Sequence, residues 1–279
     1  VRADGSVDGG DFLDGFENGY FAEPKEPTGT VYHQYCTAIP VGTLLAQSWN
    51  LDLMKKLGQM IAGEMNEFEV TLWLAPGMSL HRNPLCGRNF EYYSEDPLLA
   101  GRMASAMTLG VQSVPGCGTT IKHYACNNQE DNRMGSDSIL SERTLREIYL
   151  KGFEIAIRNA QPMAMMTSYN LINGVHAANS YDICTKAARD EWGFEGAIMT
   201  DWTTTTDSTA GECTAAGCMK AGNDMVMPGD IRDHASIRQA LEDGSLDIRE
   251  LKRCVYHTVK IILQSNQYED AVSYEDQFK

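Results

Sequence analysis

Long apolar runs and an excess of positive charge are both absent from this sequence. No stretch of about 18 apolar residues occurs, so we expect no transmembrane helix. Lys and Arg together number 23 against 38 Asp and Glu, which leaves a net charge of −15. Because phosphate groups would be repelled, the composition excludes nucleic acid and an anionic membrane surface as partners.

Cysteines with the spacing of metal sites are also missing. None of the eight forms a C-x-x-C motif, and no histidine stands at metal-ligand spacing beside Cys213 and Cys218. We therefore expect no metal. The cysteines are too few for a disulfide scaffold, so we interpret them as reduced thiols, which favours a cytoplasmic location. They stand at positions 36, 86, 117, 126, 184, 213, 218 and 254.

Nucleotide-binding loops are a third absence, and what remains is an alternation of short strands and helices. No G-x-G-x-x-G or G-x-x-x-x-G-K-[ST] motif occurs. Alternating strands and helices predict a parallel sheet covered by helices, and a single α/β barrel typically needs about 250 residues. The strand-like runs are 70–75, 119–122, 164–169, 196–200 and 224–227; the helical stretches begin after Asn50, at Pro97 and after Ser141, and continue at 180–191, 231–243 and 248–264.

In the first of these helices, the apolar positions Leu53, Leu57, Met60 and Ile61 predict one buried face. In the helix after Ser141, we expect Leu145, Ile148, Tyr149 and Ala156 to face inward. Residues 1 to about 30 are rich in Gly, Asp and Glu and predict a long surface loop.

Polar and ionisable residues gather where three of the predicted strands end. They are Lys122 and His123, Tyr169 and Asn170, and Asp201 and Trp202. The carboxyl ends of barrel strands form the catalytic face, so these residues predict an active site. A carboxylate such as Asp201, flanked by Lys and Arg, should have a lowered pKa and could attack an anomeric carbon, with Trp202 as a flat wall for a sugar ring.

Each candidate also has a structural explanation. A single Asp at a strand end is most often a helix cap or a salt-bridge partner, and a lone His is most often a core residue. Arg88 stands among Glu91, Glu95 and Asp96, which would suit a structural ion pair. Lys122 could instead form a Schiff base as in barrel aldolases, although no phosphate loop follows it.

Six segments resemble glycoside hydrolase family 3, in the order and spacing of that family. They are Trp73–Gly77, His81–Pro97, Ile121–Arg133, Ser141–Tyr149, Met166–Gly174 and Trp192–Trp202. The resemblance runs from about Ala38 to about Gly229. It implies a TIM-like (β/α)8 barrel, incomplete at the N-terminus, of the β-glucosidase-like branch, and it implies no cofactor.

The resemblance implies a role for each matching residue. Asp201 resembles the catalytic nucleophile, which forms a covalent glycosyl-enzyme intermediate. Tyr169 resembles a hydrogen-bonding neighbour of the nucleophile. Glu130 and Glu142 are interpreted as structural, with Glu130 orienting an arginine. The expected sugar-binding donors are Arg88, Lys122, His123 and Arg133, and the expected apolar walls are Met166 and Trp202.

The sequence departs from the family where the second carboxylate is needed. Retaining hydrolysis uses two carboxyl groups about 5–5.5 Å apart. In the β-glucosidase-like branch the acid/base is a Glu on an α/β sandwich domain, which we expect to lie outside this chain. The β-N-acetylhexosaminidase branch uses a second His on a barrel loop, and the segment Lys122–Asn128 lacks it.

The ends of the chain suggest a longer parent protein. Val1-Arg2 resembles the end of a family segment, Asp-Gly-Pro-x-Gly-[Val/Leu]-Arg, whose Asp binds sugar. We expect that Asp and the first barrel strand to precede the chain, and a bacterial parent with the sandwich first and the barrel last. The predicted divisions are an extension at 1–37, the barrel at 38–266 and a polar tail at 267–279.

These expectations define the predicted function. The parent should be an exo-acting retaining β-glycosidase that hydrolyses terminal β-D-glucosyl or xylosyl residues of a β-linked substrate. The isolated chain should be weakly active or inactive. A non-catalytic carbohydrate-binding barrel and a Lys122 aldolase are the alternatives.

Overall fold

The core of the molecule is a parallel sheet, in a computed structural model that describes residues 36–206 and 213–268. Its strands lie in the order β1-β2-β4-β7, with the bounds β1 (Leu72–Trp73), β2 (Gly118–Tyr124), β4 (Ala164–Thr167) and β7 (Ala197–Met199). Ala164 lies opposite both Thr120 and Ala197. A further parallel bridge joins Met199 to Met225. Four of the five predicted strand runs are therefore confirmed, and they lie in sequential order; the fifth, 224–227, is present only as the bridge at Met225.

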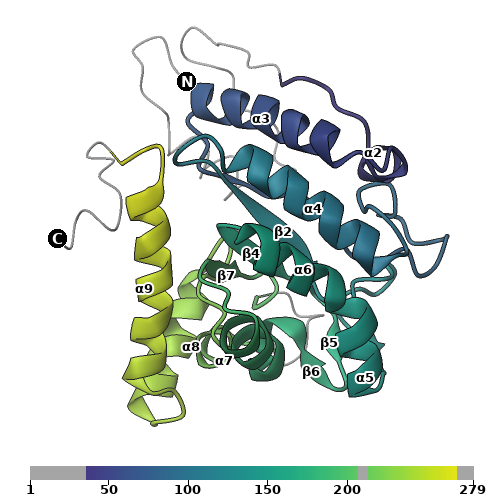
Figure 1. Ribbon diagram of the computed structural model, residues 1–279. Coiled ribbons are helices and arrows are strands. Elements are labelled where there is room, and N and C mark those ends of the chain that lie inside the picture. The colour runs from purple at the N-terminus through teal and green to yellow at the C-terminus, as the bar shows by residue number, and fades with distance from the viewer. Residues whose placement is uncertain (1–35, 207–212, 269–279) are drawn as a thin grey trace, which may run out of the picture. The chain divides into compact units, whose positions relative to one another are not determined.

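Three helical segments cover the first strands and confirm the predicted caps. They are α3 (Leu51–Glu67), α4 (Pro97–Val111), and a continuous run of α5 (Glu142–Thr144), a π-helical segment (Leu145–Tyr149) and α6 (Lys151–Ala160). The side chain of Asn50 accepts a hydrogen bond from the N–H of Leu53, and that of Ser141 accepts one from the N–H of Thr144. Figure 1 shows α3, α4 and α6 side by side.

The predicted buried face of α3 is partly wrong. Leu53 and Met60 are exposed, whereas Met54 and Met65 are buried together with the correctly predicted Ile61. The reason is the close crossing with α4: a side chain at Gly58 would collide with the backbone of that helix. The helix therefore turns Gly58 and its neighbours at helical spacing inward. In the helical run after Ser141, Ile148 is likewise exposed rather than inward-facing.

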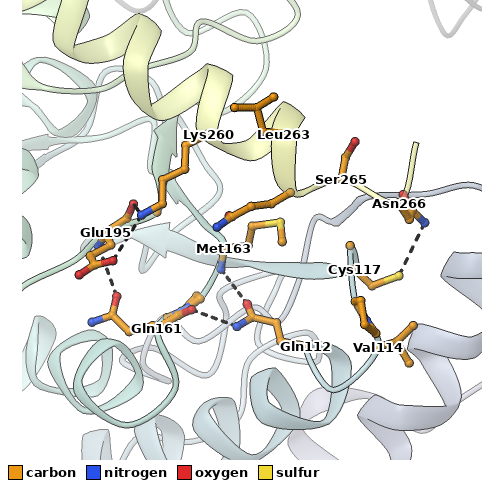
Figure 2. Close-up of a pocket in the computed structure, with 15 residues that line it drawn as sticks. Gln112, Val114, Cys117, Gln161, Met163, Glu195, Lys260, Leu263, Ser265 and Asn266 are labelled. Atoms are coloured by element: carbon orange, nitrogen blue, oxygen red, sulfur yellow. Dashed lines mark hydrogen bonds and ion pairs between the residues drawn. The ribbon is translucent and has the colours of Figure 1, made fainter. Parts of the chain in front are cut away.

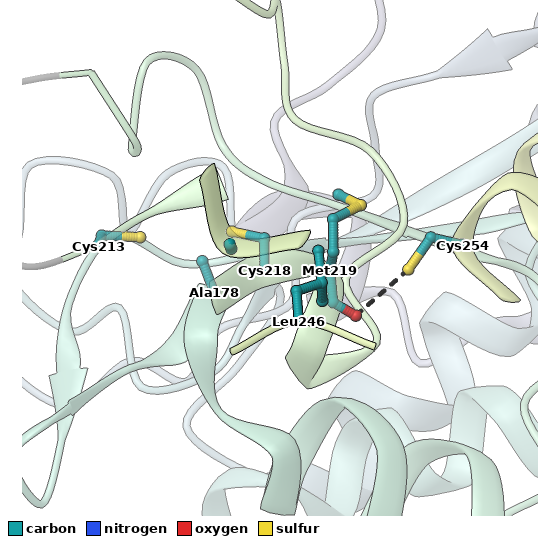
Figure 3. Close-up of a cluster of buried hydrophobic side chains, with 7 residues drawn as sticks. Ala178, Cys213, Cys218, Met219, Leu246 and Cys254 are labelled. Atoms are coloured by element: carbon teal, nitrogen blue, oxygen red, sulfur yellow. Dashed lines mark hydrogen bonds between the residues drawn. The ribbon is translucent and has the colours of Figure 1, made fainter. Parts of the chain in front are cut away.

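The second half of the chain forms a helical group, and its last three helices pack on a cysteine-rich core. Its elements are a π-helical segment (Asp182–Glu191), α7 (Ala215–Ala221), α8 (Ile231–Glu242) and α9 (Ile248–Gln264). Figure 3 shows Cys213, Cys218 and Cys254 among Met219 and Leu246. All eight cysteines are unpaired and seven are buried, which confirms them as free thiols. Burial raises the pKa of Cys254 to about 12.

The structure contains several short helices and strands that the sequence did not predict. They are α2 (Gly42–Gln47), a three-residue 3-10 turn (Ala177–Asn179), and a three-stranded sheet of β3 (Asp137–Ser138), β5 (Leu171–Ile172) and β6 (Val175–His176). Segments this short carry little periodicity. The loop expected at 1–30 lies outside the described residues, as do nearly all of the predicted extension and tail, so those boundaries stay predictions.

Within residues 36–206 and 213–268, no helix is both long and apolar enough to cross a lipid bilayer. The same residues contain no group of three or more His, Cys, Asp or Glu side chains arranged to hold a metal ion.

Candidate active site

The site forms where the carboxyl ends of β2, β4 and β7 meet, as the sequence predicts. Lys122 and His123 are the fifth and sixth residues of β2, Tyr169 follows β4, and Asp201 follows β7. Parallel pairing of the three strands brings these ends to one edge of the sheet. The loop between β1 and α4 adds Arg88, which acts electrostatically on Asp201.

Asp201 lies at the centre of this edge. Its carboxylate Oδ1 accepts a hydrogen bond of 2.7 Å from the N–H of Trp202. Its Oδ2 is buried and has no hydrogen-bond partner among the described residues; Nε2 of His123 lies 3.4 Å away. One oxygen is therefore held by the backbone, and the other is available to react.

The expected lowering of the Asp201 pKa is wrong. Burial raises the pKa of Asp201 above its ordinary value. The hydrogen bond from the N–H of Trp202 lowers the pKa, and so do the nearby charges of Arg88 and Lys122. The lost hydration outweighs these effects. Arg88 and Lys122 thus offset part of the free energy that burial costs the ionised carboxylate of Asp201. The sequence could not reveal this burial.

Lys122 and Arg88 share one carboxylate. Nζ of Lys122 lies 3.0 Å from Oε1 of Glu91, and Nη2 of Arg88 lies 2.6 Å from Oε2. Burial alone would raise the pKa of Glu91, but these two cations bring it below its ordinary value. The ion pair of Arg88 that the sequence suggested is therefore present, and it lies inside the candidate site.

Arg133 and Tyr169 form a second group. The guanidinium carbon of Arg133 lies 4.4 Å from the centre of the Tyr169 ring, which is cation–π geometry. Nη1 of Arg133 donates to Oε2 of Glu130 at 2.9 Å, so the predicted orienting role of Glu130 is confirmed. The Tyr169 hydroxyl donates to the carbonyl oxygen of Trp202 at 2.9 Å.

His123 is buried and is held by a tyrosine that sequence analysis missed. The Tyr92 hydroxyl lies 2.9 Å from Nδ1 of His123. Burial, together with the charges of Arg88, Lys122 and Arg133, lowers the His123 pKa well below its ordinary value, so the imidazole is neutral.

The two residues predicted as apolar walls of the pocket, Met166 and Trp202, differ in their burial. Met166 is buried in a cluster with Ala164 and Met199, so its contact with a sugar stays a prediction. Trp202 is partly buried next to Asp201. The sequence did not predict three polar residues of the site, although they lie inside the segments His81–Pro97 and Ile121–Arg133 that resemble family 3. They are Glu91, Tyr92 and Asn127.

A cavity of about 490 Å³ lies at the opposite ends of the strands. Several of its polar side chains bond to one another or to the backbone. Gln112 accepts from the N–H of Met163 and donates to the carbonyl of Gln161, and Lys260 pairs with Glu195 (Figure 2). We therefore assign it no ligand.

Comparison with known proteins identifies the family. Residues 24–261 match the model of the glycosyl hydrolase family 3 N-terminal domain. The chain belongs to glycosyl hydrolase family 3. Its fold class is accordingly the TIM-like (β/α)8 barrel, of which the described parallel strands are a part.

Relatives of this family 3 chain have two different activities in their names. Beta-glucosidase A of Butyrivibrio fibrisolvens is 51% identical over 60% of this chain and 20% of its own length. An exo-alpha-(1->6)-L-arabinopyranosidase of Bifidobacterium breve is 42% identical over 81% of this chain and 29% of its own. The chain thus spans less than a third of these curated relatives.

A solved structure supports the fold. Beta-glucosidase 3B from Thermotoga neapolitana, in complex with alpha-D-glucose, is 42% identical with a TM-score of 0.79. The match covers 89% of the family 3 chain and 36% of that protein.

Proposed function

We propose that this chain carries the nucleophile of a retaining, exo-acting β-glycosidase that releases terminal non-reducing β-D-glucosyl or β-D-xylosyl residues. The observation that carries the proposal is the state of Asp201. It is buried at the strand ends, with Oδ1 fixed by a backbone N–H and Oδ2 without a hydrogen bond among the described residues. Beta-glucosidases among the relatives support the substrate class.

In the proposed reaction, Oδ2 of Asp201 attacks the anomeric carbon. The C1–O bond to the leaving group breaks, the leaving group takes the bonding pair, and an ester links the sugar to Asp201. Water then attacks the same carbon and gives a proton to the base, the C1–O bond to Asp201 breaks with its electron pair returning to the carboxylate, and the sugar is released with retained configuration. Arg88, Lys122, His123 and Arg133 are proposed to hold the sugar hydroxyls, because charged or fixed donors orient the ring.

The general acid is proposed to come from a Glu outside this chain, on the sandwich domain of the parent protein. Glu91 is paired with Lys122 and Arg88, and Glu130 with Arg133, so neither is poised to carry the proton. The short span of the chain relative to its relatives also supports this assignment. The isolated chain should then act only on substrates whose leaving group departs without protonation.

The aldolase alternative is disfavoured by the ion pair of Lys122, because a Schiff base needs an uncharged amine that is not bound to a carboxylate. A purely carbohydrate-binding barrel would not need a carboxylate oxygen that, as Oδ2 of Asp201 does, lacks a hydrogen bond to any described residue. We also propose that the protein works in the cytoplasm or another reducing compartment, since all eight cysteines are free thiols.

A burst experiment tests the proposed function. We would mix the chain with 2,4-dinitrophenyl β-D-glucoside and follow dinitrophenolate release, with the β-D-xyloside and the α-L-arabinopyranoside in parallel. A burst of about one dinitrophenolate per chain, followed by slow turnover, is expected, because this leaving group needs no acid, whereas water must attack the covalent intermediate without the base that the proposed Glu would supply. Absence of a burst with all three sugars would contradict the proposal.

A further inference from the structure

A series of polar contacts runs from Asp201 through four further side chains to Arg133; its first step, between Oδ2 of Asp201 and Nε2 of His123, is a close approach without a hydrogen bond. The order is Asp201, His123, Tyr92, Asn127, Glu130 and Arg133, with contacts of 3.4, 2.9, 2.8, 3.1 and 2.9 Å. Within this series of contacts, Tyr92 and His123 are almost completely buried. The direction of each hydrogen bond follows from the chemistry of its partners.

Glu130 fixes the orientation of the Asn127 amide. The Glu130 carboxylate, paired with Arg133, can only accept hydrogen bonds, so the group 3.1 Å from its Oε1 must be the amide NH₂ of Asn127. The same NH₂ lies 2.8 Å from the Tyr92 hydroxyl and donates to it. That hydroxyl oxygen is therefore already an acceptor, and its own proton is left to donate.

The Tyr92 proton points to His123. Nδ1 of His123 lies 2.9 Å from the hydroxyl oxygen. Ser79 also interacts with Tyr92, but its hydroxyl bonds the main-chain carbonyl and N–H of His123. A neutral imidazole that accepts at Nδ1 must carry its proton on Nε2, the atom that faces Oδ2 of Asp201.

We propose that Tyr92 is a positioning residue that holds His123 as the Nε2–H tautomer, so that the N–H of His123 faces the site beside Asp201 and is available to a hydroxyl of the bound sugar. With the proton on Nδ1, the imidazole would turn a lone pair toward the carboxylate, and a donor would be lost from the site. The catalytic part of this inference rests on the proposed function; the tautomer itself does not.

Nitrogen NMR of the histidine-labelled chain tests the tautomer directly. The His123 signal, assigned by its loss in His123→Gln, should show a protonated Nε2 and an unprotonated Nδ1. His176 is an internal contrast: its Nδ1 lies 3.1 Å from the carbonyl oxygen of Tyr169, which can only accept, so His176 should carry its proton on Nδ1. A His123 signal with a protonated Nδ1 in the unmodified chain would overturn the proposal.

Tyr92→Phe tests whether the hydroxyl of Tyr92 sets the tautomer of His123. His123 should lose its Nε2–H preference, and the dinitrophenolate burst should slow roughly tenfold to a hundredfold, as for loss of a buried hydrogen bond in a charged network. Tyr93→Phe removes the hydroxyl of the neighbouring buried tyrosine, which makes no described contact with His123, and should change neither readout. An unchanged His123 tautomer in Tyr92→Phe would refute the role of Tyr92.

The two proposals can fail separately. If no chain gives a burst while His123 is an Nε2–H tautomer that depends on Tyr92, the proposed function fails and the tautomer inference stands. If Tyr92→Phe does not fold, the spectrum of the unmodified chain still decides whether Nδ1 is the acceptor.

Discussion

Two buried aspartates, Asp201 and Asp224, lie close to strand β7, and their hydrogen-bonding surroundings differ. Asp224 has both carboxylate oxygens bonded: Oδ2 accepts from Arg189 at 2.5 Å and from the N–H of Ile198 at 2.7 Å, and Oδ1 lies 2.9 Å from Nδ1 of His257. Asp201 has one oxygen bonded to the backbone and the other without a hydrogen bond among the described residues.

The difference separates a structural carboxylate from a reactive one. A buried charge is costly unless it is paired and hydrogen-bonded, and Asp224 meets that condition fully. Asp201 does not, and burial raises its pKa above the ordinary value. Proteins keep such unfavourable arrangements mainly at functional sites.

The largest expected effect belongs to Asp201→Asn. The amide has nearly the same shape but is a poor nucleophile, so the dinitrophenolate burst should fall by at least about a thousandfold. Circular dichroism should show an unchanged fold. A variant that keeps a normal burst would show that another residue attacks the sugar.

Asp224→Asn should reduce stability, whereas Asp201→Asn should reduce the reaction. It leaves the Arg189 guanidinium buried without its counterion, which should cost about 3–5 kcal/mol in the free energy of unfolding, measured by urea titration. Asp230→Asn is the control, because its exposed partner Arg232 stays hydrated and Asn also caps a helix. Equal midpoints for Asp224→Asn and the control would contradict the structural role of Asp224.

Lys122→Met should give an intermediate effect on the reaction. Removal of one charged donor next to Asp201 should slow the burst about tenfold to a hundredfold. The matched control is Lys151→Met, which replaces a more exposed lysine that pairs with Glu154. If both variants lose rate equally, Lys122 has no specific part in the site.

The smallest effect concerns pH and stability. Because the folded pKa of Asp201 is raised, the ionised carboxylate destabilises the fold above that pKa, and the cost disappears as pH falls and the group is protonated in both states. Asp201→Asn should therefore be more stable than the unmodified chain near neutral pH, and the advantage should shrink as pH falls and vanish at about pH 3, below the ordinary pKa of Asp. Urea titrations at both pH values would check this, and a variant that is less stable near neutral pH would contradict the raised pKa.

Much of the site was predictable because it lies at the ends of short apolar strands. Asp201, Tyr169, Lys122 and His123 follow from the strand runs, and the helix caps at Asn50 and Ser141 follow from local hydrogen bonding. These features depend on residues close together in the sequence.

The features that were missed depend on packing between distant segments. The pKa of Asp201 rises because other parts of the chain exclude water from it, which no local pattern records. Tyr92 reaches His123 across 31 positions, and the buried face of α3 is set by the crossing of Gly58 with α4.

The most direct test of the account is to trap the nucleophile. The folded chain would be incubated with a 2-fluoro glucoside that carries a dinitrophenolate leaving group, and its intact mass and peptide map would be recorded. The fluorine slows hydrolysis of the covalent intermediate, so an adduct should accumulate on the peptide that contains Asp201. An adduct on a different carboxylate, or none under conditions where the burst occurs, would contradict the assignment of Asp201.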